Sequence, residues 1–203
     1  MKSKIKSVAK SNQQSSALNS SENLSKRITT KKDWKHLNVD RIVKLQLDNL
    51  NDLISKLIMP HAINKAKNDG AFGCIVLFAG STKGKKLAAK LVGKQNLLDV
   101  YRINLSRLVS NYTNETEKNL EKLFDAAEEK NWVLFFDEAD ALFGKRTDVG
   151  DSHDRYANEE ISYLLQRIKE YPGLIIFSSK NKDDSNNTFP IHFNEIIHFK
   201  KPS

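Results

Sequence analysis

Five short apolar runs, separated by stretches of helical character, most constrain the fold of this 203-residue chain. The first run, CIVLFA at residues 74–79, is continuous rather than alternating, which predicts a strand buried on both faces. Residues 85–92, 115–129 and 155–170 carry apolar residues at helical spacing. Strands that alternate with helices of this length predict an α/β fold of three layers, with a parallel sheet between helices. The runs are residues 74–79, 100–105, 132–137, 174–178 and 196–199.

The net charge of +8 is concentrated at the N-terminus. Residues 1–32 hold eight lysines and arginines against Glu22, which gives +7 and leaves +1 for the rest of the chain. This segment has no apolar periodicity and no aromatic residue, so we expect a disordered basic tail. Leucine and isoleucine at helical spacing predict an N-terminal helical segment within residues 33–70 that packs on the core. Residues 71–203 then form that core.

Composition narrows the classes of protein that this chain can represent. Cys74 is the only cysteine, which excludes an intrachain disulfide and fits a reducing compartment. Its place in an apolar run predicts a buried, inert thiol rather than a reactive one. No apolar run reaches the ~18 residues that a membrane span needs. We therefore expect a cytoplasmic protein without a membrane partner. A nucleic-acid partner has only the charge of the tail in its favour, because the tail lacks interleaved aromatic residues.

A glycine-containing turn follows the first apolar run and leads into a helix, which is the context of a phosphate-binding loop. Backbone N–H groups in such a turn face phosphate oxygens, and the helix dipole favours the anion. Compared with the pattern G-x-x-x-x-G-K-S/T, the chain keeps Gly84 and Lys85 but has Ala79 at the first glycine and Lys86 at the hydroxyl position. The predicted nucleotide-binding residues are Gly80, Ser81, Thr82, Lys83, Gly84, Lys85 and Lys86.

The third apolar run ends in two carboxylates, Asp137 and Glu138. In P-loop ATPases a strand-end aspartate holds Mg²⁺ and the following glutamate polarises the attacking water. This pattern makes Asp137 and Glu138 the candidate catalytic residues, with Asp137 as the candidate Mg²⁺ ligand. The alternative is an acidic strand end that only caps the next helix.

The sequence FFDEADALFGKR at residues 135–146 resembles the Walker B segment of AAA+ ATPases. DVYRINLS at residues 99–106 and YTNETEKNL at residues 112–120 are similar to the family's second strand and the start of its next helix. DSHDRYAN at residues 151–158 and YLLQR at residues 163–167 resemble a bacterial branch that includes ATPases of contractile injection systems. The resemblance covers residues 34–199. It implies ATP as ligand, five parallel strands in the order 5-1-4-3-2, and ring assembly.

Four features depart from the family pattern, and all four concern hydrolysis. Lys86 replaces the hydroxyl that holds Mg²⁺, and Lys180 stands at the polar sensor position after the fourth strand. Residues 189–193, FPIHF, stand where the family carries paired arginines. The sequence given stops at Ser203, just past the fifth strand, so we expect a core without the helical lid that the family normally carries.

Lys86 and Lys180, the lysines that depart from the family pattern, suggest that an ammonium charge replaces the charge of the metal ion. A carboxylate without a counter-ion is costly to bury, so an ammonium group beside Asp137 would offset a missing metal. We hypothesise that Lys86 or Lys180 forms an ion pair with Asp137. The alternative is that both lysines extend into solvent.

Three functions remain open from the sequence. The first is an AAA+ ATPase with low residual activity. The second is a pseudo-enzyme that binds ATP or ADP without turnover, or an adaptor that has lost nucleotide binding. The third is a binder of nucleic acid or of an acidic partner through residues 1–32. The residue chemistry favours an ATP-binding core with impaired hydrolysis that acts in or beside a larger assembly.

Overall fold

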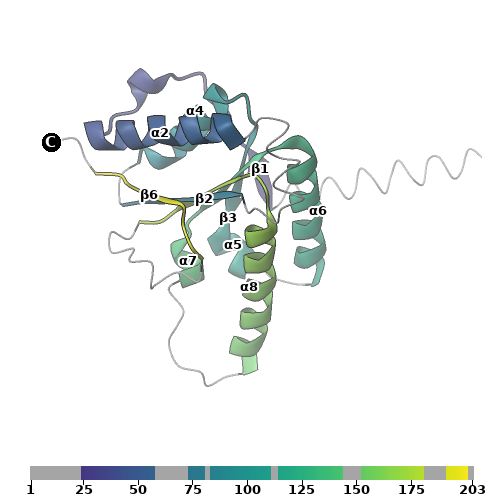
Figure 1. Cartoon of the computed structure of the whole chain (residues 1–203). Coiled ribbons are helices and arrows are strands. Elements are labelled where there is room, and N and C mark those ends of the chain that lie inside the picture. Colours follow the sequence, from purple (N-terminus) through teal and green to yellow (C-terminus); the bar gives the residue numbers. More distant parts are fainter. Residues whose placement is uncertain are drawn as a thin grey trace, which may run out of the picture.

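The computed structural model describes residues 24–57, 73–80, 83–110, 114–143, 152–180 and 191–200 of the chain (Figure 1). In the figure one sheet lies between two layers of helices. The strands are β1 (Ser25–Arg27), β2 (Cys74–Ala79), β3 (Val100–Asn104), β4 (Val133–Asp137), β5 (Leu174–Ser178) and β6 (Glu195–His198). The helices are η1 (Trp34–His36), α2 (Arg41–Leu57), α4 (Lys85–Gln95), α5 (Leu105–Ser110), α6 (Asn114–Lys130), α7 (Asp140–Phe143) and α8 (Ser152–Glu170).

The strands form a single sheet in the order β1-β3-β4-β5-β2-β6. All neighbours from β3 to β6 are parallel. Read from the β6 edge, strands β6, β2, β5, β4 and β3 follow the order 5-1-4-3-2, so the predicted α/β fold and strand order are confirmed.

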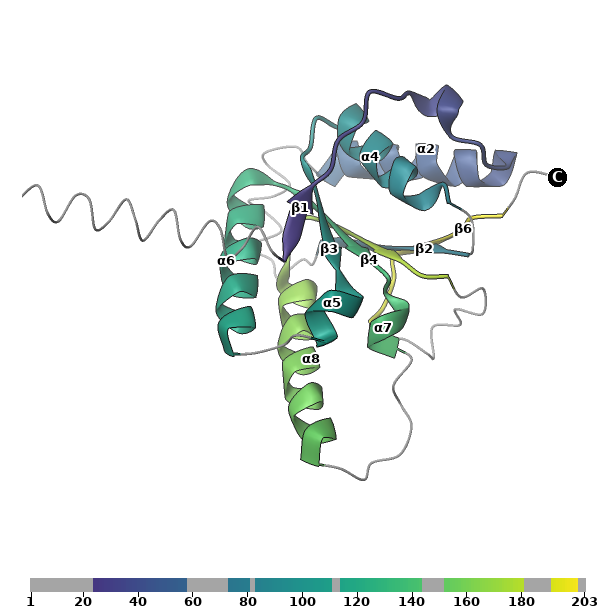
Figure 2. The same cartoon turned by 180° about the vertical axis from the view of Figure 1, so that it is seen from behind.

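A sixth strand, β1, corrects the predicted strand count. β1 pairs antiparallel with the outer edge of β3, and Lys26 lies opposite Arg102 (Figure 2). Residues 25–27 therefore belong to the sheet and not to the tail in which the sequence placed them. Residues 1–23 lie outside the described part of the chain, so the remainder of the tail stays a prediction.

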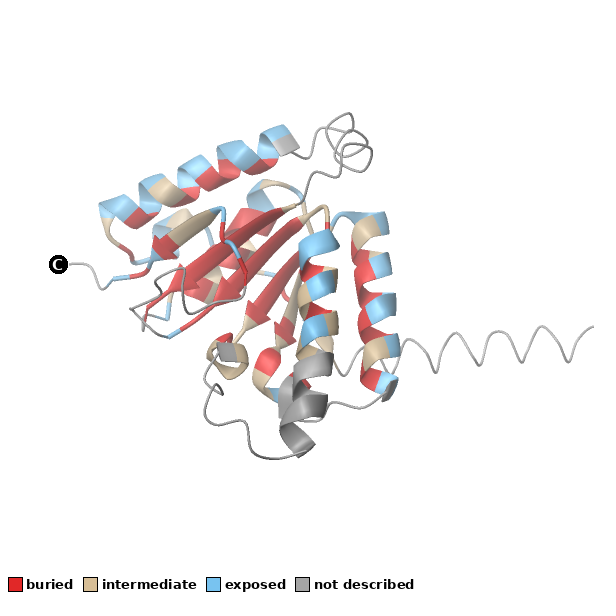
Figure 3. Ribbon diagram, turned by 60° about the horizontal axis from the view of Figure 1, so that its bottom comes forward, coloured by how far each residue is buried: buried red, intermediate tan, exposed pale blue. Residues whose placement is uncertain are grey.

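The alternation of side chains divides the core into two clusters, one on each face of the sheet. Along β2, Val76 and Phe78 point to the face covered by α2 and α4, whereas Ile75 and Leu77 point to the face covered by α5, α6 and α8. All six residues of β2 are buried. Figure 3 shows the strands buried between helices whose outer surfaces are exposed. This two-sided burial explains why the apolar runs are continuous.

Helix α2 packs on α4 through both apolar and polar contacts. Val43, Leu47, Leu50 and Ile54 form its buried stripe. The amide of Asn51, which is 2% exposed, donates to the Leu47 carbonyl at 2.8 Å. Its Oδ1 accepts a hydrogen bond of 2.8 Å from Asn96, just after α4. The helix that the sequence predicted ends at Leu57 in the described chain, and residues 58–72 lie outside it.

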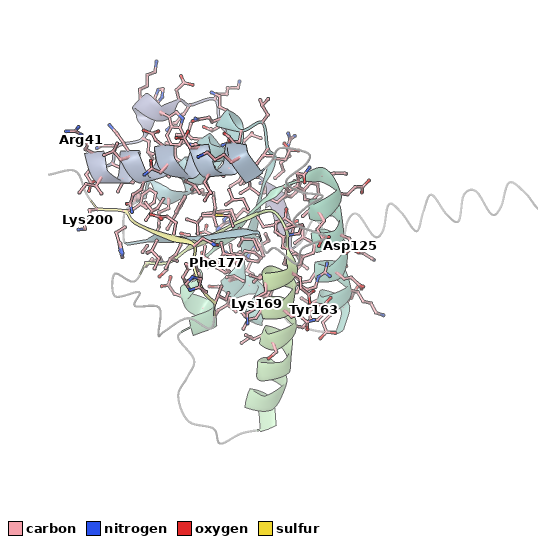
Figure 4. All side chains as sticks on the ribbon, viewed as in Figure 1. Arg41, Asp125, Tyr163, Lys169, Phe177 and Lys200 are labelled. Atoms are coloured by element: carbon pink, nitrogen blue, oxygen red, sulfur yellow. The ribbon has the colours of Figure 1, made fainter. Side chains whose placement is uncertain are left out.

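The opposite helical layer is joined by an ion pair between α6 and α8. Arg167 donates to Asp125 at 3.0 Å, and its guanidinium lies 5.4 Å from the ring centroid of Phe124. Figure 4 shows Asp125 on α6 and Tyr163 on α8 in this layer. Within the described residues, none of the helices is both long enough and apolar enough to cross a membrane.

The position of Cys74 gives a first prediction. Burial raises the pKa of the Cys74 thiol to about 11, with a smaller contribution from the charge of Glu195. At pH 8 the thiolate is the reactive species, so we expect the folded chain to react with DTNB at least about 100-fold more slowly than the chain in guanidinium chloride. The reaction is followed by absorbance of the released thiolate.

An exposed cysteine provides the control for this measurement. Ile42 is 68% exposed on α2, so Ile42→Cys adds a thiol that reacts rapidly in the folded protein while Cys74 stays slow. A native Cys74 rate within about tenfold of the denatured rate contradicts the buried, protonated thiol.

Candidate functional site

The carboxyl ends of the central parallel strands bring the predicted site residues to one edge of the sheet. β2 leads into Gly80 and the loop before α4, and β4 ends at Asp137. β5 lies between them in the sheet and ends beside Ser179. In open α/β sheets ligands bind outside the carboxyl ends of the strands. The described part of the predicted loop and the acidic pair therefore share one edge of the sheet.

The phosphate loop leaves β2 through a glycine in a conformation that other residues rarely adopt. Gly80 has φ +104°, and a Cβ at this position would lie 2.5 Å from the carbonyl oxygen of Phe199. Gly84, by contrast, has φ −72° and caps α4 at its N-terminus. Ser81 and Thr82 lie outside the described residues, and Lys83 is exposed.

Lys85 is buried, at 7% exposure, in the first turn of α4. Its ammonium group donates to the backbone carbonyls of Gly80 and Ser179. These carbonyls lie just past the ends of β2 and β5, so Lys85 connects the loop to both strands. An ammonium group at this point, beside the N-terminus of an 11-residue helix, suits an anionic ligand.

The acidic pair has a strained backbone and a distinct set of hydrogen bonds. Glu138 has φ +61°, the left-handed region that is uncommon for residues other than glycine. Its backbone N–H donates to Asp137 Oδ1 at 3.1 Å. The next residue, Ala139, donates its N–H to the Ser178 carbonyl at 2.9 Å. The chain thus turns sharply at Glu138 and is held against the end of β5.

Asp140 has a role that the sequence analysis did not assign. Its Oδ1 accepts a hydrogen bond of 2.8 Å from the Ser179 hydroxyl. Its carboxylate also accepts the backbone N–H of Lys180, at 3.0 Å for Oδ2. Asp140, the last carboxylate of the sequence DEAD at residues 137–140, therefore anchors the segment that follows β5.

The ion pair of Asp137 corrects the hypothesis made from the sequence. Asp137 Oδ2 accepts a hydrogen bond from Arg102 Nε at 2.7 Å, and the two side chains are 20% and 26% exposed. Among the described residues Asp137 has no other salt bridge, so neither Lys86 nor Lys180 is its ion-pair partner. Lys180 is exposed, as the alternative predicted.

The geometry of the sheet explains why Arg102 reaches Asp137. β3 and β4 are parallel, with Asn104 beside Asp137. Arg102 lies two residues before Asn104, so both side chains leave the same face of β3. The side chain of Arg102 is long enough for its guanidinium to reach Asp137, which lies diagonally across from it on β4. The sequence showed Arg102 within its family motif, but the partner becomes visible only when the two strands are in register.

Lys86 and its neighbours surround the ion pair with positive charge. Burial of its ammonium group lowers the pKa of Lys86, the charge of Arg102 lowers it further, and the carboxylate of Asp137 opposes this shift. The charges of Lys90, one turn further along α4, and Lys26, opposite Arg102 on β1, also lower it. We call Lys26, Lys86, Lys90 and Arg102 the basic cluster.

The described residues do not fit a Mg²⁺ site at Asp137. Mg²⁺ prefers oxygen ligands in octahedral geometry. Here both oxygens of Asp137 already accept hydrogen bonds, and Lys86 presents an ammonium group where a hydroxyl would be needed. In the described part of the chain, no three histidine, cysteine, aspartate or glutamate side chains converge in a group that could hold a metal ion.

The arginine position of the family also lacks a guanidinium in the described residues. Of the segment at 189–193, residues 191–193 are described. Ile191 and Phe193 are buried in the core, and His192 is exposed.

A parallel sheet with a glycine turn after β2, a buried lysine at a helix N-terminus and an acidic pair at the end of β4, with β5 between the two strands, is the arrangement of a P-loop NTPase core. The family model described as "ATPase family associated with various cellular activities (AAA)" matches residues 75–201, which is more than half of the chain. The chain therefore belongs to the AAA family.

Several curated relatives support this assignment. The chain is 34% identical over 129 residues to the uncharacterized AAA family ATPase y4kL of Sinorhizobium fredii, covering 63% of this chain and 39% of the relative. It is 30% identical to the Cell division cycle protein 48 homolog of Archaeoglobus fulgidus, covering 54% and 15%. It is also 30% identical to the proteasome-activating nucleotidase of Aeropyrum pernix, covering 71% and 37%. The chain thus spans well under half the length of these relatives.

The backbone of Gly80 gives a second prediction. Gly80→Ala places a side chain in the left-handed region and against the Phe199 carbonyl, so we expect a loss of about 2 kcal/mol or more in the free energy of unfolding. Gly84→Ala is the matched control, because the same change at φ −72° should alter stability by less than about 1 kcal/mol. Urea titrations followed by circular dichroism measure both. Equal effects of the two substitutions would disprove the strain at Gly80.

Proposed function

We propose that this chain is the nucleotide-binding core of an AAA protein, which binds ATP or ADP at residues 80–86 and hydrolyses ATP slowly or not at all. The observation that carries this proposal is the Arg102–Asp137 ion pair, which engages the carboxylate that would otherwise serve Mg²⁺. Lys86, at the position of the metal-binding hydroxyl, supports the same reading.

Nucleotide binding is supported by the groups that remain. Lys85 is held at the N-terminus of α4 beside a loop that turns at Gly80, which is the arrangement that receives phosphate oxygens. Binding here needs an ammonium group and backbone N–H donors, and it does not need the arginine or sensor positions. Binding and hydrolysis can therefore be separated in this chain.

We further propose that the core acts in or beside a larger cytoplasmic assembly. The resemblance to AAA+ ATPases implies ring contacts, in which a neighbouring subunit supplies an arginine to the nucleotide. Such an arginine typically contributes about 10³–10⁵-fold in rate. An assembly with an active partner subunit is therefore the arrangement in which this core would regulate turnover without performing it.

The second candidate is an adaptor that has lost nucleotide binding. It is favoured by the hydrogen bonds of Lys85, whose ammonium group is already held by two carbonyls. A ligand phosphate would have to compete with these bonds. A nucleotide-binding titration distinguishes the adaptor from the nucleotide-binding core.

A binding titration followed by a turnover assay tests the proposed function. We expect saturable binding of a fluorescent ATP analogue, and phosphate release that changes less than about twofold in Glu138→Gln, whereas loss of a working general base typically costs about 10²–10⁴-fold. Gln keeps the shape of the side chain at this strained position. Glu129→Gln, an exposed position on α6, is the matched control.

The alternatives give different results in these assays. Phosphate release that disappears in Glu138→Gln and persists in Glu129→Gln would establish an active ATPase. An absence of nucleotide binding would favour the adaptor.

A further inference from the structure

The ion pair between Arg102 and Asp137 is a built feature of the site and not a loose surface contact. Both side chains are at least partly shielded from solvent, at 26% and 20% exposed. Arg102 Nε donates to Oδ2, and the backbone N–H of Glu138 donates to Oδ1. A metal ion at Asp137 would have to share the carboxylate with the Arg102 guanidinium, whose positive charge opposes it.

The surroundings of this pair also oppose a further cation. Lys86 lies in the first turn of α4, and the charges of Arg102, Lys90 and Lys26 all act on it. These residues come from α4, β3 and β1, so the fold itself gathers the basic cluster on one face of the sheet. On that face the negative charge of Asp137 raises the pKa of Lys86, against the effect of the three basic residues. A divalent cation that approaches Asp137 from this face meets the positive charges of Arg102 and Lys86.

The same cluster suits phosphate groups that carry no metal. Guanidinium and ammonium groups bind phosphate oxygens through charge-assisted hydrogen bonds. A nucleoside triphosphate without Mg²⁺ carries more negative charge than its Mg²⁺ complex, so it gains more from a positive site. The N-terminus of α4 and Lys85 add their positive potential at the same place.

We propose that this loop binds nucleoside di- or triphosphates without a divalent cation, and that the Arg102 guanidinium takes the place of the metal beside Asp137. The proposal rests on the nucleotide binding proposed above and adds the ionic form of the ligand. It also gives Lys86 a role. Where the family has a Ser or Thr hydroxyl that binds the metal, Lys86 has an ammonium group that can bind a phosphate oxygen.

Nucleotide titrations of the full chain in excess EDTA and in excess MgCl₂ test this proposal. With a fluorescent ADP or ATP analogue, we expect binding about threefold or more tighter in EDTA than in MgCl₂, because Mg²⁺ competes with the protein for the metal-free nucleotide. Binding that is equally tight or weaker in EDTA overturns the proposal and leaves the proposed nucleotide-binding function intact. An absence of binding in both conditions overturns both.

A double variant designed to make nucleotide binding depend on Mg²⁺ provides a second test. In the double variant Lys86→Thr with Arg102→Met, a hydroxyl replaces the ammonium group and Asp137 loses its guanidinium partner. We expect this variant to bind nucleotide about tenfold or more tightly in MgCl₂ than in EDTA. Lys118→Met with Lys122→Thr is the charge-matched control, because both lysines are exposed on α6, on the other face of the sheet. A double variant that still binds nucleotide as tightly in EDTA as in MgCl₂, or more tightly, contradicts the role of Arg102.

Manganese provides a readout that does not depend on turnover. Electron paramagnetic resonance reports the concentration of free Mn²⁺ in the presence of nucleotide and protein. We expect the natural chain to shift the Mn²⁺–nucleotide equilibrium toward free Mn²⁺, because the protein withdraws metal-free nucleotide. The Lys86→Thr, Arg102→Met variant should instead retain Mn²⁺ in a protein complex. Retention of Mn²⁺ by the natural chain overturns the proposal.

Discussion

The site depends on the hydrogen bonding of β2 to a parallel strand on each side. All six residues of β2 are buried, and its partners are β5 and β6. The pairing continues past the strand ends, where Phe199 donates its N–H to the Ala79 carbonyl at 2.8 Å and Ser179 donates to Phe78 at 3.1 Å. The phosphate loop therefore starts from a fixed backbone. This also explains the requirement for glycine at position 80, because the Phe199 carbonyl is held too close for a Cβ.

Three charged groups at this edge of the sheet, those of Lys85, Asp137 and Asp140, are satisfied by protein partners. Lys85 is bonded to two carbonyls, Asp140 to the Ser179 hydroxyl and the Lys180 N–H, and Asp137 to Arg102 and the Glu138 N–H. Partly buried charges are stable in this setting because each has a donor or acceptor in place. The site is thus organised by its own side chains and backbone. A ligand phosphate that contacts Lys85 would compete with the two carbonyls that already hold its ammonium group.

Much of the fold could be predicted from the sequence, because two-sided burial gives continuous apolar runs at β2, β4 and β5. The strand β1 could not, because Ser25–Arg27 has no apolar pattern and forms only against the open edge of β3. The acidic pair was visible as a motif. Its partner Arg102 was not, because an ion pair between strands depends on their register, which a linear sequence does not display. The anchoring role of Asp140 depends in the same way on the position of β5.

The departures from the family pattern do not have equal weight once the structure is known. At position 180 the described contact is made by the backbone N–H, which donates to Asp140, and the side chain is exposed. Any residue other than proline could make that bond, so Lys180 has little effect on the site. Lys86 differs, because its ammonium group is partly buried within reach of the charges of Arg102 and Asp137. A hydroxyl there would leave Arg102 and Asp137 as a neutral pair, whereas an ammonium group leaves an excess of positive charge for a phosphate. If the core binds nucleotide as proposed, position 86, rather than position 180, is the departure that would set the ionic form of that nucleotide.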